Sequence, residues 1–358
     1  MTRAAGRLPV TVLAGTDEAD LASAVLAVQW DLPDAVVVRH ELDEEAGTVR
    51  RIVSDATGVL DDSTTPMEHA CHACALREDL VPTLLGLAEQ GRAGVALVVL
   101  PDAAELLPVG SALGSDVVDA RVPELLDLRG VAAVVDPRDL VARVTIDAWD
   151  PDVGPRSALA VLQAEYADVL VLAGPTDPTG HGDPADLTFL RHLARQDATM
   201  VEGASALDAA TLLGVRHDAD RVHRHHDPRR RRPTGAADEH GIATAVFESW
   251  RPLHPRRLMD EMEPMVLSSL RTRGAFWLPT RPEAALVWDE CCGQLRLGSC
   301  GQWQDHRRTC LVVTAHAEDL DQFGRHFERA LMTDAELAGA QRWVGRPDGF
   351  EEWVGDAA

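Results

Sequence analysis

Two cysteines at Cys-x-x-Cys spacing have the clearest capacity for chemistry in this chain. Cys71 and Cys74 can together hold one Zn²⁺ through their thiolates, and four ligands are normal in a structural zinc site. Two further ligands must therefore come from elsewhere, with His72 and His69 as the near candidates and Glu68 or a distant residue as the alternative. A thiol pair without metal and a redox pair stay open, although the local sequence lacks thioredoxin-like surroundings. The spacing favours zinc.

A segment rich in histidine and arginine lies much further along the chain. It runs from Asp220 to Pro233 without apolar periodicity, which indicates a linker. A solvated linker is a better interpretation than a metal-ligand cluster for the loosely spaced histidines in and just before this segment, which are His217, His223, His225 and His226. The run Arg229–Arg232 is the only strong basic run, and such runs are more often solvated than bound to RNA phosphates.

The remaining cysteines all fall near the C-terminus, at Cys291, Cys292, Cys300 and Cys310. Adjacent residues of a strand point to opposite faces, so we expect that Cys291 and Cys292 cannot chelate one ion together. Core thiols are the expectation for all four. Four tryptophans are expected to fill the same core, namely Trp250, Trp277, Trp288 and Trp303. His254 precedes a proline, where a turn or a domain contact is as plausible as chemistry.

The scaffold expected for the first 215 residues is α/β. Short β-branched runs alternate with helical stretches, a pattern typical of a mostly parallel sheet covered by helices on both faces. The expected strands are Val10–Leu13, Ala35–Arg39, Ala96–Leu100, Val131–Val135 and Val169–Leu172. The expected helices include Leu21–Val28, Arg77–Gln90 and Arg156–Tyr166.

A smaller α+β domain is expected over residues 241–358, after a linker at 216–240. Ile242–Trp250 predicts a strand, a helix should begin near Pro255, and Gln294–Leu297 alternates between polar and apolar residues. One apolar face of a later helix is marked by Leu320, Phe323, Phe327 and Leu331. Thr333 and Glu336 have the spacing of a capping box that opens another helix.

Composition limits the classes of function. The chain has 358 residues, a mean hydropathy of −0.11 and a net charge of −24. These values favour a globular protein of two domains without membrane association, and they argue against DNA or broad nucleic-acid binding. The N-terminal stretch is unlike a secretory signal, and six cysteines suit reduced thiols or a metal better than disulfides, so we expect a cytoplasmic protein.

The order of the motifs resembles one known family. A first strand over Pro9–Gly15 is followed by Cys71–Cys74 directly ahead of Leu76-Arg77, and later by Arg251–Pro255 and Gly274–Leu278. In this order the motifs resemble those of the CobW-type metal-chaperone GTPases. The resemblance covers most of the chain and implies a P-loop NTPase-like G domain over 1–215 and a CobW C-terminal domain over 241–358. The metal motif of the family is C-x-C-C, and Ala73 replaces its middle cysteine here.

The nucleotide motifs of the family are missing from this chain. Its G-x-x-G-x-G-K-T cradle keeps only Gly15, because Glu18, Asp20, Leu21 and Ala22 replace the later glycines, the lysine and the hydroxyl. The chain has no lysine or asparagine, so N-K-x-D at 173–176 is also absent, and E-x-x-G near 99–102 has lost both defining residues. A GC-rich genome would deplete lysine and asparagine codons, but it would not remove glycines.

A vestigial nucleotide site is therefore expected, with Gly15 and Asp136 as its remaining members. The three carboxylates of Asp17, Glu18 and Asp20 would repel a triphosphate at the start of the following helix. We expect a pseudo-GTPase that binds GTP and Mg²⁺ poorly and has no catalytic residue. If the site is active, the expected activity is hydrolysis of GTP.

The degenerate phosphate-binding loop and the Cys71–Cys74 motif ahead of L-R-E-D-L most resemble one actinobacterial branch of the family, typified by the MPY recruitment factor. That branch implies a zinc-responsive, non-hydrolysing adaptor, which would bring a ribosome hibernation factor to the small ribosomal subunit. The enzymatic alternative is a CobW-type GTPase that delivers zinc to a client protein. A domain pair with an unrelated protein partner is a third reading, and the oligomeric state stays open.

Overall fold

The computed structural model describes residues 6–43, 45–69, 71–100, 104–145, 154–174, 183–230, 239–304 and 306–355. The chain divides into two compact units. The first unit comprises Met1–Arg138, Leu159–Gly182 and Ala194–His223, and the second comprises Asp139–Ala158, Asp183–Leu193 and Arg224–Ala358. The division therefore differs from the continuous ranges expected from the sequence, because the second unit includes two earlier segments.

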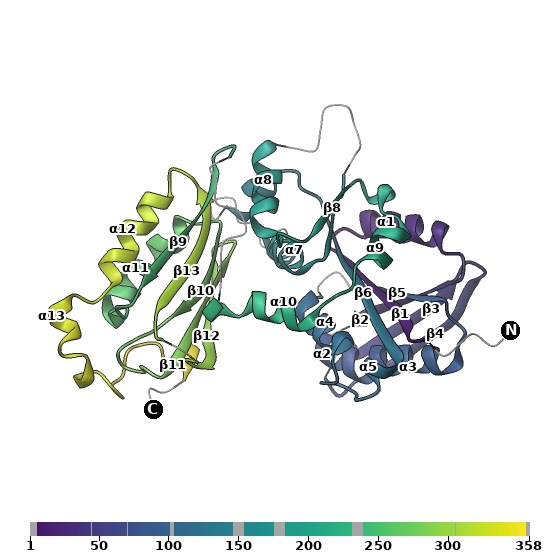
Figure 1. The fold of residues 1–358 in the computed structure, drawn as a ribbon, viewed down its shortest axis with the longest axis horizontal. Helices are drawn as coiled ribbons and strands as arrows, with labels where there is room; N and C mark the ends of the chain where they lie inside the picture. The colour runs from purple at the N-terminus through teal and green to yellow at the C-terminus, as the bar shows by residue number, and fades with distance from the viewer. Residues whose placement is uncertain are drawn as a thin grey trace. The chain divides into compact units, whose positions relative to one another are not determined.

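The first unit contains an eight-stranded sheet in the order β4-β3-β2-β5-β1-β6-β7-β8 (Figure 1). Its strands are β1 (Leu8–Gly15), β2 (Ala35–Asp43), β3 (Thr48–Asp55), β4 (Gly58–Pro66), β5 (Val95–Val99), β6 (Leu126–Val135), β7 (Val169–Leu172) and β8 (Thr199–Glu202). The six strands from β2 to β8 in this order run parallel, and β3 and β4 continue the sheet as an antiparallel hairpin. The predicted parallel sheet is confirmed, since each expected strand coincides with one of these.

Helices cover both faces of this sheet. They are α1 (Glu18–Asp31), α2 (His72–Ala75), the π-helical η1 (Leu76–Leu80), α3 (Val81–Gln90), α4 (Leu106–Gly114), α5 (Val122–Leu125), η3 (Ala204–Ala206) and α9 (Ala209–Gly214). Helices α7 (Gly154–Tyr166) and α10 (Ala219–His226) each contain a boundary between segments of the two units. One face packs on α1 and α9, with Leu21, Val25 and Val28 of α1 buried against strand residues such as Leu97. Figure 1 shows α3, α4 and α5 on the opposite face. Burial on both faces explains the unbroken apolar runs of the central strands.

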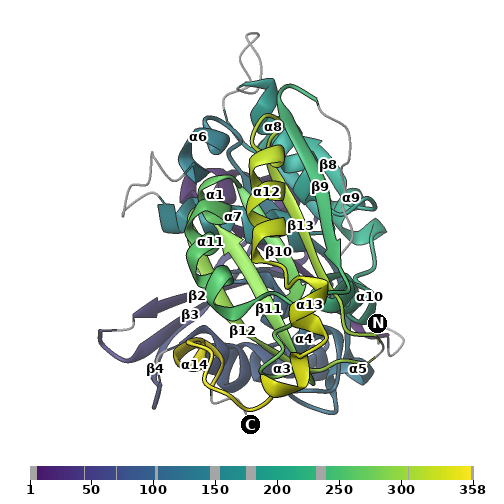
Figure 2. The same cartoon turned by 90° about the vertical axis from the view of Figure 1, so that its left-hand side faces the viewer.

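The second unit contains a five-stranded antiparallel sheet in the order β12-β11-β10-β13-β9. Its strands are β9 (Ile242–Ser249), β10 (Arg271–Phe276), β11 (Ala284–Cys291), β12 (Gln294–Gln302) and β13 (Thr309–His316). Its helices are α6 (Leu140–Val144), α8 (Pro184–Leu193), η4 (Pro228–Arg230), α11 (Pro255–Leu267), α12 (Leu320–Ala330), α13 (Asp334–Leu337), η5 (Ala340–Arg342) and α14 (Glu351–Val354). Figure 2 shows α11 and α12 along one face of the sheet. Phe323 and Phe327 of α12 belong to the same buried cluster as Phe276 and Trp288 of the strands.

Several local expectations for the second unit are confirmed. The capping box at Thr333 and Glu336 is formed, with each side chain bonded to the backbone N–H of the other residue. His254 occupies the N-cap of α11 and its ring lies 5.0 Å from that of Trp343, so it has the turn role. The tryptophan expectation is wrong for Trp250, which is 64% exposed, whereas Trp288 is fully buried.

The hairpin between β11 and β12 overturns another expectation. Cys291 pairs with Gln294, so Cys292 and Gly293 form a two-residue turn in which both have positive φ, 54° and 70°. The left-handed backbone turns the Cys292 side chain back toward its neighbour, and the two sulfur atoms lie 3.5 Å apart. The prediction that they point apart is wrong because Cys292 belongs to the turn and not to the strand. Cys291, Cys292 and Cys310 are buried thiols, and Cys300 is half-buried.

The expected linker at 216–240 also needs correction. Residues 219–226 form α10, which is opened by the Asp218 side chain as it accepts from the Arg221 N–H. Val222 is the one fully buried residue of this helix, so its apolar pattern is too sparse to indicate a helix. Residues 231–238, with Arg231 and Arg232, lie outside the described part. In the described residues, no helix has the length and apolar character needed to cross a bilayer.

Candidate metal site and neighbouring strand ends

The carboxyl ends of the parallel strands form one edge of the first unit's sheet. In open α/β sheets, ligands bind outside this edge. β1 ends here at Gly15, and β5 ends at Val99. The pairing of β2 with β5 ends at Arg39, so His40 is the first residue beyond it. The sheet therefore places His40 beside Leu100, which follows β5.

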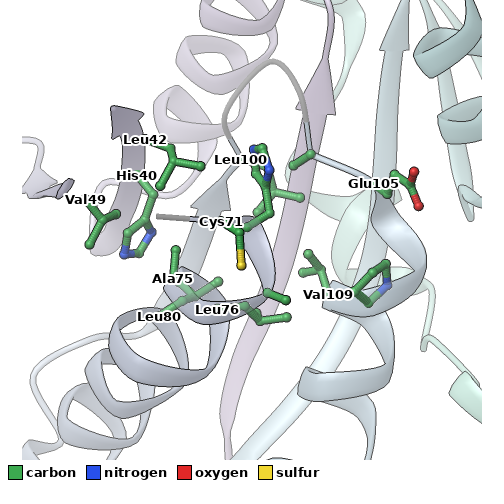
Figure 3. A pocket seen from close by; sticks show the side chains of 14 residues that line it. His40, Leu42, Val49, Cys71, Ala75, Leu76, Leu80, Leu100, Glu105 and Val109 are labelled. Carbon is green, nitrogen blue, oxygen red and sulfur yellow. The ribbon is translucent and has the colours of Figure 1, made fainter. Parts of the chain in front are cut away.

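A cavity of about 330 Å³ lies next to these two residues. Its wall is mostly apolar, with side chains such as Leu80 and Val109, and its polar members are His40, Cys71, His72 and Glu105. Figure 3 shows Cys71 between His40 and Val109 in this view. Strand β2 and helix α2 thus bring two potential metal ligands from distant parts of the sequence to one cavity.

The Cys-x-x-Cys motif is arranged by the start of α2. Cys71 is the N-cap, and its sulfur accepts a hydrogen bond from the Cys74 backbone N–H at 3.4 Å. This bond, followed by the hydrogen bond from the Cys74 thiol, lowers the pKa of Cys71. The pKa of Cys74 is raised, first by its side-chain hydrogen bond with Cys71. The two sulfurs therefore form a pair in which Cys71 ionises first and is the better metal ligand.

His40 is held by a buried chain of charged groups. Its Nε2 lies 2.7 Å from Oδ1 of Asp79, and Oδ2 of Asp79 accepts from Nη1 of Arg51 at 2.7 Å. Burial alone would raise the pKa of Asp79, but the hydrogen bonds and charges of His40 and Arg51 lower it overall. Asp79 is therefore an ionised acceptor near neutral pH, and Nε2 of His40 must carry the hydrogen.

Two imidazole nitrogens at this cavity have no hydrogen-bond partner among the residues that the structure describes. They are Nδ1 of His40 and Nε2 of His72, and both atoms are buried. With its hydrogen on Nε2, a neutral His40 has a lone pair at Nδ1. A metal-ligating histidine commonly donates its other N–H to a carboxylate in this way. The donor set around the cavity, two sulfurs and two nitrogens, suits Zn²⁺.

The predicted ligands are only partly brought together. Cys71 and His72 line the cavity and the Cys74 thiol meets that of Cys71, whereas the His69 side chain is exposed to solvent. Within the described ranges, no three histidine, cysteine, aspartate or glutamate side chains lie close enough to hold a metal ion. The four-ligand set Cys71, Cys74, His72 and His69 thus stays a prediction.

The C-terminal part of the chain is similar to a known domain family. Residues 242–331 match the family described as the cobalamin synthesis protein CobW C-terminal domain. This segment is therefore similar to a CobW C-terminal domain. It includes all five strands of the second unit together with α11 and α12.

Individual relatives match a greater length of the chain. The chain is 28% identical to a zinc chaperone of Mycobacterium tuberculosis. The alignment covers 98% of this chain and 94% of that chaperone. It is 21% identical to zinc-regulated GTPase metalloprotein activator 1 of Dictyostelium discoideum, over 83% of this chain and 68% of that protein. The structure of a Zn(II)-bound YjiA GTPase from E. coli aligns over 91% of this chain and 100% of the YjiA chain, with 16% sequence identity and a TM-score of 0.36. The two sequence relatives match the first unit as well as the second.

The expected nucleotide position is acidic. Asp17 is the N-cap of α1, and its Oδ1 accepts from the Asp20 N–H at 2.9 Å. The pKa of Asp20 is raised, first by burial and then by the charges of Asp17 and Asp136, while Arg138 opposes the shift. The Arg138 guanidinium binds Asp136 through both carboxylate oxygens. Several carboxylates therefore share one arginine where a phosphate chain would need positive groups.

Gly15 has a structural reason to be glycine. A Cβ at this position would lie 2.9 Å from the Val134 carbonyl oxygen and 3.2 Å from the Val134 Cβ, because β1 and β6 are close here. Packing alone therefore explains this residue, and its presence does not indicate a nucleotide. The other expected elements, at 175–176 and 101–102, lie outside the described residues.

In the described residues, the histidines near α10 do not form a metal-ligand cluster. His217 is buried in the first unit, with Nδ1 2.8 Å from Asp168 and Nε2 3.1 Å from the Tyr166 hydroxyl. Its expected place in a solvated linker is therefore wrong. Arg229 is bound to Asp227 and to the Gln302 carbonyl, and Arg230 to Gln304. These two arginines are occupied by the protein itself.

Sequence reasoning missed His40 and Asp79. His40 directly follows the predicted strand Ala35–Arg39, and the carboxyl end of a parallel strand is where a ligand residue is expected. Asp79 lies in the L-R-E-D-L segment that follows the cysteines. The signal for His40 was therefore its position at the end of a strand, while the contact with Asp79 depends on the fold.

Proposed function

We propose that this protein is a CobW-type zinc chaperone that binds Zn²⁺ at the Cys71–Cys74 motif and transfers it to a client protein. One observation carries the proposal: Cys71, whose pKa is lowered, lines a cavity where two buried imidazole nitrogens have no hydrogen-bond partner among the described residues. The names of the Mycobacterium and Dictyostelium relatives support zinc as the metal. Zinc is cargo in this proposal.

The ligand set that we propose is Cys71, Cys74, His72 and His40. His40 takes the place of His69, because Nδ1 of His40 is buried at the cavity whereas His69 is exposed. The imidazoles must turn toward the sulfurs, since the donors do not yet converge within the described residues. A site assembled only when metal arrives suits transfer, because the same movement in reverse releases the ion. Asp79 fixes the His40 tautomer throughout.

Zinc binding by the full chain tests this site. Competition with a colorimetric chelator is expected to give one zinc per chain, and Cys71→Ser or Cys74→Ser should abolish it. Asp79→Asn should weaken binding by about 10- to 100-fold, because outer-shell partners of a ligating histidine have effects of this size. Cys300→Ser is the matched control, since that half-buried thiol lies in the second unit.

Two results would oppose the zinc proposal. Unchanged zinc affinity in the Cys71→Ser/Cys74→Ser double variant would place the metal elsewhere. Unchanged affinity in His40→Gln, with the Cys71 variants still defective, would remove His40 from the ligand set. Circular dichroism of each variant separates lost binding from lost folding, and His40→Gln serves as the second variant if Asp79→Asn does not fold.

A non-hydrolysing adaptor is the second candidate, and the acidic nucleotide position favours it. Asp17, Asp20 and Asp136 lie where a triphosphate would bind, with Arg138 already bound to Asp136. In this form the protein would respond to zinc and recruit a hibernation factor to the ribosome without GTP. Equilibrium binding of GTP–Mg²⁺ with and without zinc separates the candidates. Micromolar binding with turnover favours a GTP-driven chaperone, and its absence together with zinc-dependent co-sedimentation with ribosomes favours the adaptor.

A further inference from the structure

The hairpin that joins β11 and β12 contains a second thiol pair, far along the chain from the proposed zinc motif. Sγ of Cys291 and Sγ of Cys292 are 3.5 Å apart, and both residues are nearly fully buried, at 7% and 1% exposure. The pairing depends on the positive φ of Cys292, which an L-residue adopts at some cost. We propose that this pair is a binding site for trivalent arsenic, As(III), held as a neutral dithiol adduct.

The number of ligands available at Cys291 and Cys292 excludes Zn²⁺ as the bound ion. In the described part of the chain, no third histidine, cysteine or carboxylate side chain joins this pair as a metal ligand. The carboxyl group of the adjacent Glu290 is occupied, with Oε2 accepting from the Ser269 hydroxyl at 3.0 Å and Oε1 from the Gly293 N–H at 3.1 Å. Zn²⁺ normally takes four protein ligands in a closed site, so two sulfurs alone do not suit it.

The sulfur separation selects among ions that accept two thiolates. With metal–sulfur bonds of about 2.3 Å, two sulfurs 3.5 Å apart subtend an angle of about 100° at a shared atom. A linear two-coordinate ion such as Cu(I) would need sulfurs about 4.6 Å apart for bonds of that length, and the turn would have to open. Three-coordinate As(III) is pyramidal, and bond angles of this size are normal for it.

The charge of the bound complex also favours As(III) at this thiol pair. The hydrogen bond with Cys292, followed by burial, raises the pKa of Cys291 well above its ordinary value, so the Cys291 thiol is neutral. The nearby Arg271 already binds Asp289 and the Glu290 carbonyl, so its charge is compensated. An anionic dithiolate complex would thus place a new charge in a buried site, which is costly. The arsenic adduct carries no charge.

The reaction balances without an oxidant or a reductant. Arsenous acid, As(OH)₃, reacts with the two thiols to give one As–OH group bonded to both sulfurs, and two water molecules leave. Two As–O and two S–H bonds break, two As–S bonds form, and the released hydroxyls take the two thiol protons. Arsenic stays trivalent throughout. Brief opening of the two-residue turn gives the reagent access to Cys291, which is the more exposed thiol.

The test uses the full chain in a Cys71→Ser/Cys74→Ser background, so that the other thiol pair cannot contribute. The protein is incubated with arsenite and a phosphine reductant, separated by gel filtration and analysed for arsenic by mass spectrometry. One arsenic per chain is expected. Cys292→Asn should reduce retention to the background level, while Cys300→Ser and Cys310→Ser should retain one arsenic. Asparagine followed by Gly293 is the preferred pair for this type of turn, so Cys292→Asn removes the sulfur and keeps the hairpin.

Three results would overturn the proposal. They are no retained arsenic in the Cys71→Ser/Cys74→Ser protein, equal retention after Cys292→Asn, and zinc retention that Cys292→Asn abolishes. Circular dichroism of Cys292→Asn confirms that the fold is kept, and Cys291→Ser provides a second variant. The outcome is separable from that of the zinc proposal, because zinc binding should depend on Cys71 and Cys74 and be indifferent to Cys292→Asn.

Discussion

Glu290 is fully buried beside the Cys291–Cys292 pair, and its ionisation makes stability depend on pH. Burial raises its pKa from 4.5 to about 7, although Arg271, Ser269 and the Gly293 N–H oppose the shift. Between these two values the unfolded chain has lost the proton and the folded chain keeps it. Stability therefore falls as pH rises from 4.5 to 7, by about 3 kcal/mol in total for a shift of this size.

Glu290→Gln should remove this loss, because glutamine is neutral at every pH. The prediction is checked by urea unfolding at pH 5 and pH 8, followed by tryptophan fluorescence, with the variant compared to wild type at each pH. The variant should gain stability relative to wild type at pH 8 and show no such gain at pH 5. Glu283→Gln is the matched control, since the Glu283 side chain is 70% exposed. Parallel pH profiles for Glu290→Gln and wild type would contradict the assignment.

At the level of the elements, strand β10 lies between β11 and β13 and depends on one glycine. A Cβ on Gly274 would meet the Cys310 carbonyl oxygen at 2.0 Å, and a backbone atom of a central strand has little room to move. Gly274→Ala should therefore separate β10 from β13 and destabilise the second unit by about 3 kcal/mol, the upper end for overpacking.

A second glycine of the same sheet provides the control for this prediction. A Cβ on Gly298 in β12, at the sheet edge, would meet nothing within 4 Å. Gly298→Ala should change the urea midpoint little, whereas Gly274→Ala should lower it strongly in the same fluorescence experiment. Equal midpoints for the two variants would show that the sheet tolerates a side chain at Gly274, against the predicted clash.

The elements that could be predicted from sequence are those with strong local signals. The buried parallel strands appear as β-branched runs, and the capping box at Thr333 depends on a residue three positions away. Helix α10 was missed because it is polar and buries only Val222 completely. The turn at Cys292 was missed because positive φ is unusual for cysteine. The pairing of His40 with Asp79 joins residues 39 positions apart, which only the folded sheet brings together.

Charge is the property that acts at the scale of the whole molecule. The chain has 58 acidic and 34 basic side chains, so 24 carboxylates remain after every base is matched with one acid. This excess repels polyanions such as RNA and favours partners with basic surfaces. The described arginines after α10 do not offset it, because Arg229 and Arg230 are bound to groups of the protein.

The same excess predicts how stability responds to salt. Repulsion among unmatched carboxylates is stronger in the compact state than in the unfolded chain, and salt screens it over a Debye length that shrinks from about 30 Å at 0.01 M to about 8 Å at 0.15 M. At pH 7.5, raising NaCl over this range should therefore raise the urea midpoint. Near pH 5, close to the isoelectric point of 4.9, net repulsion vanishes and the gain should disappear. A midpoint that falls with salt at pH 7.5 would mean that screening of favourable ion pairs outweighs the relief of repulsion.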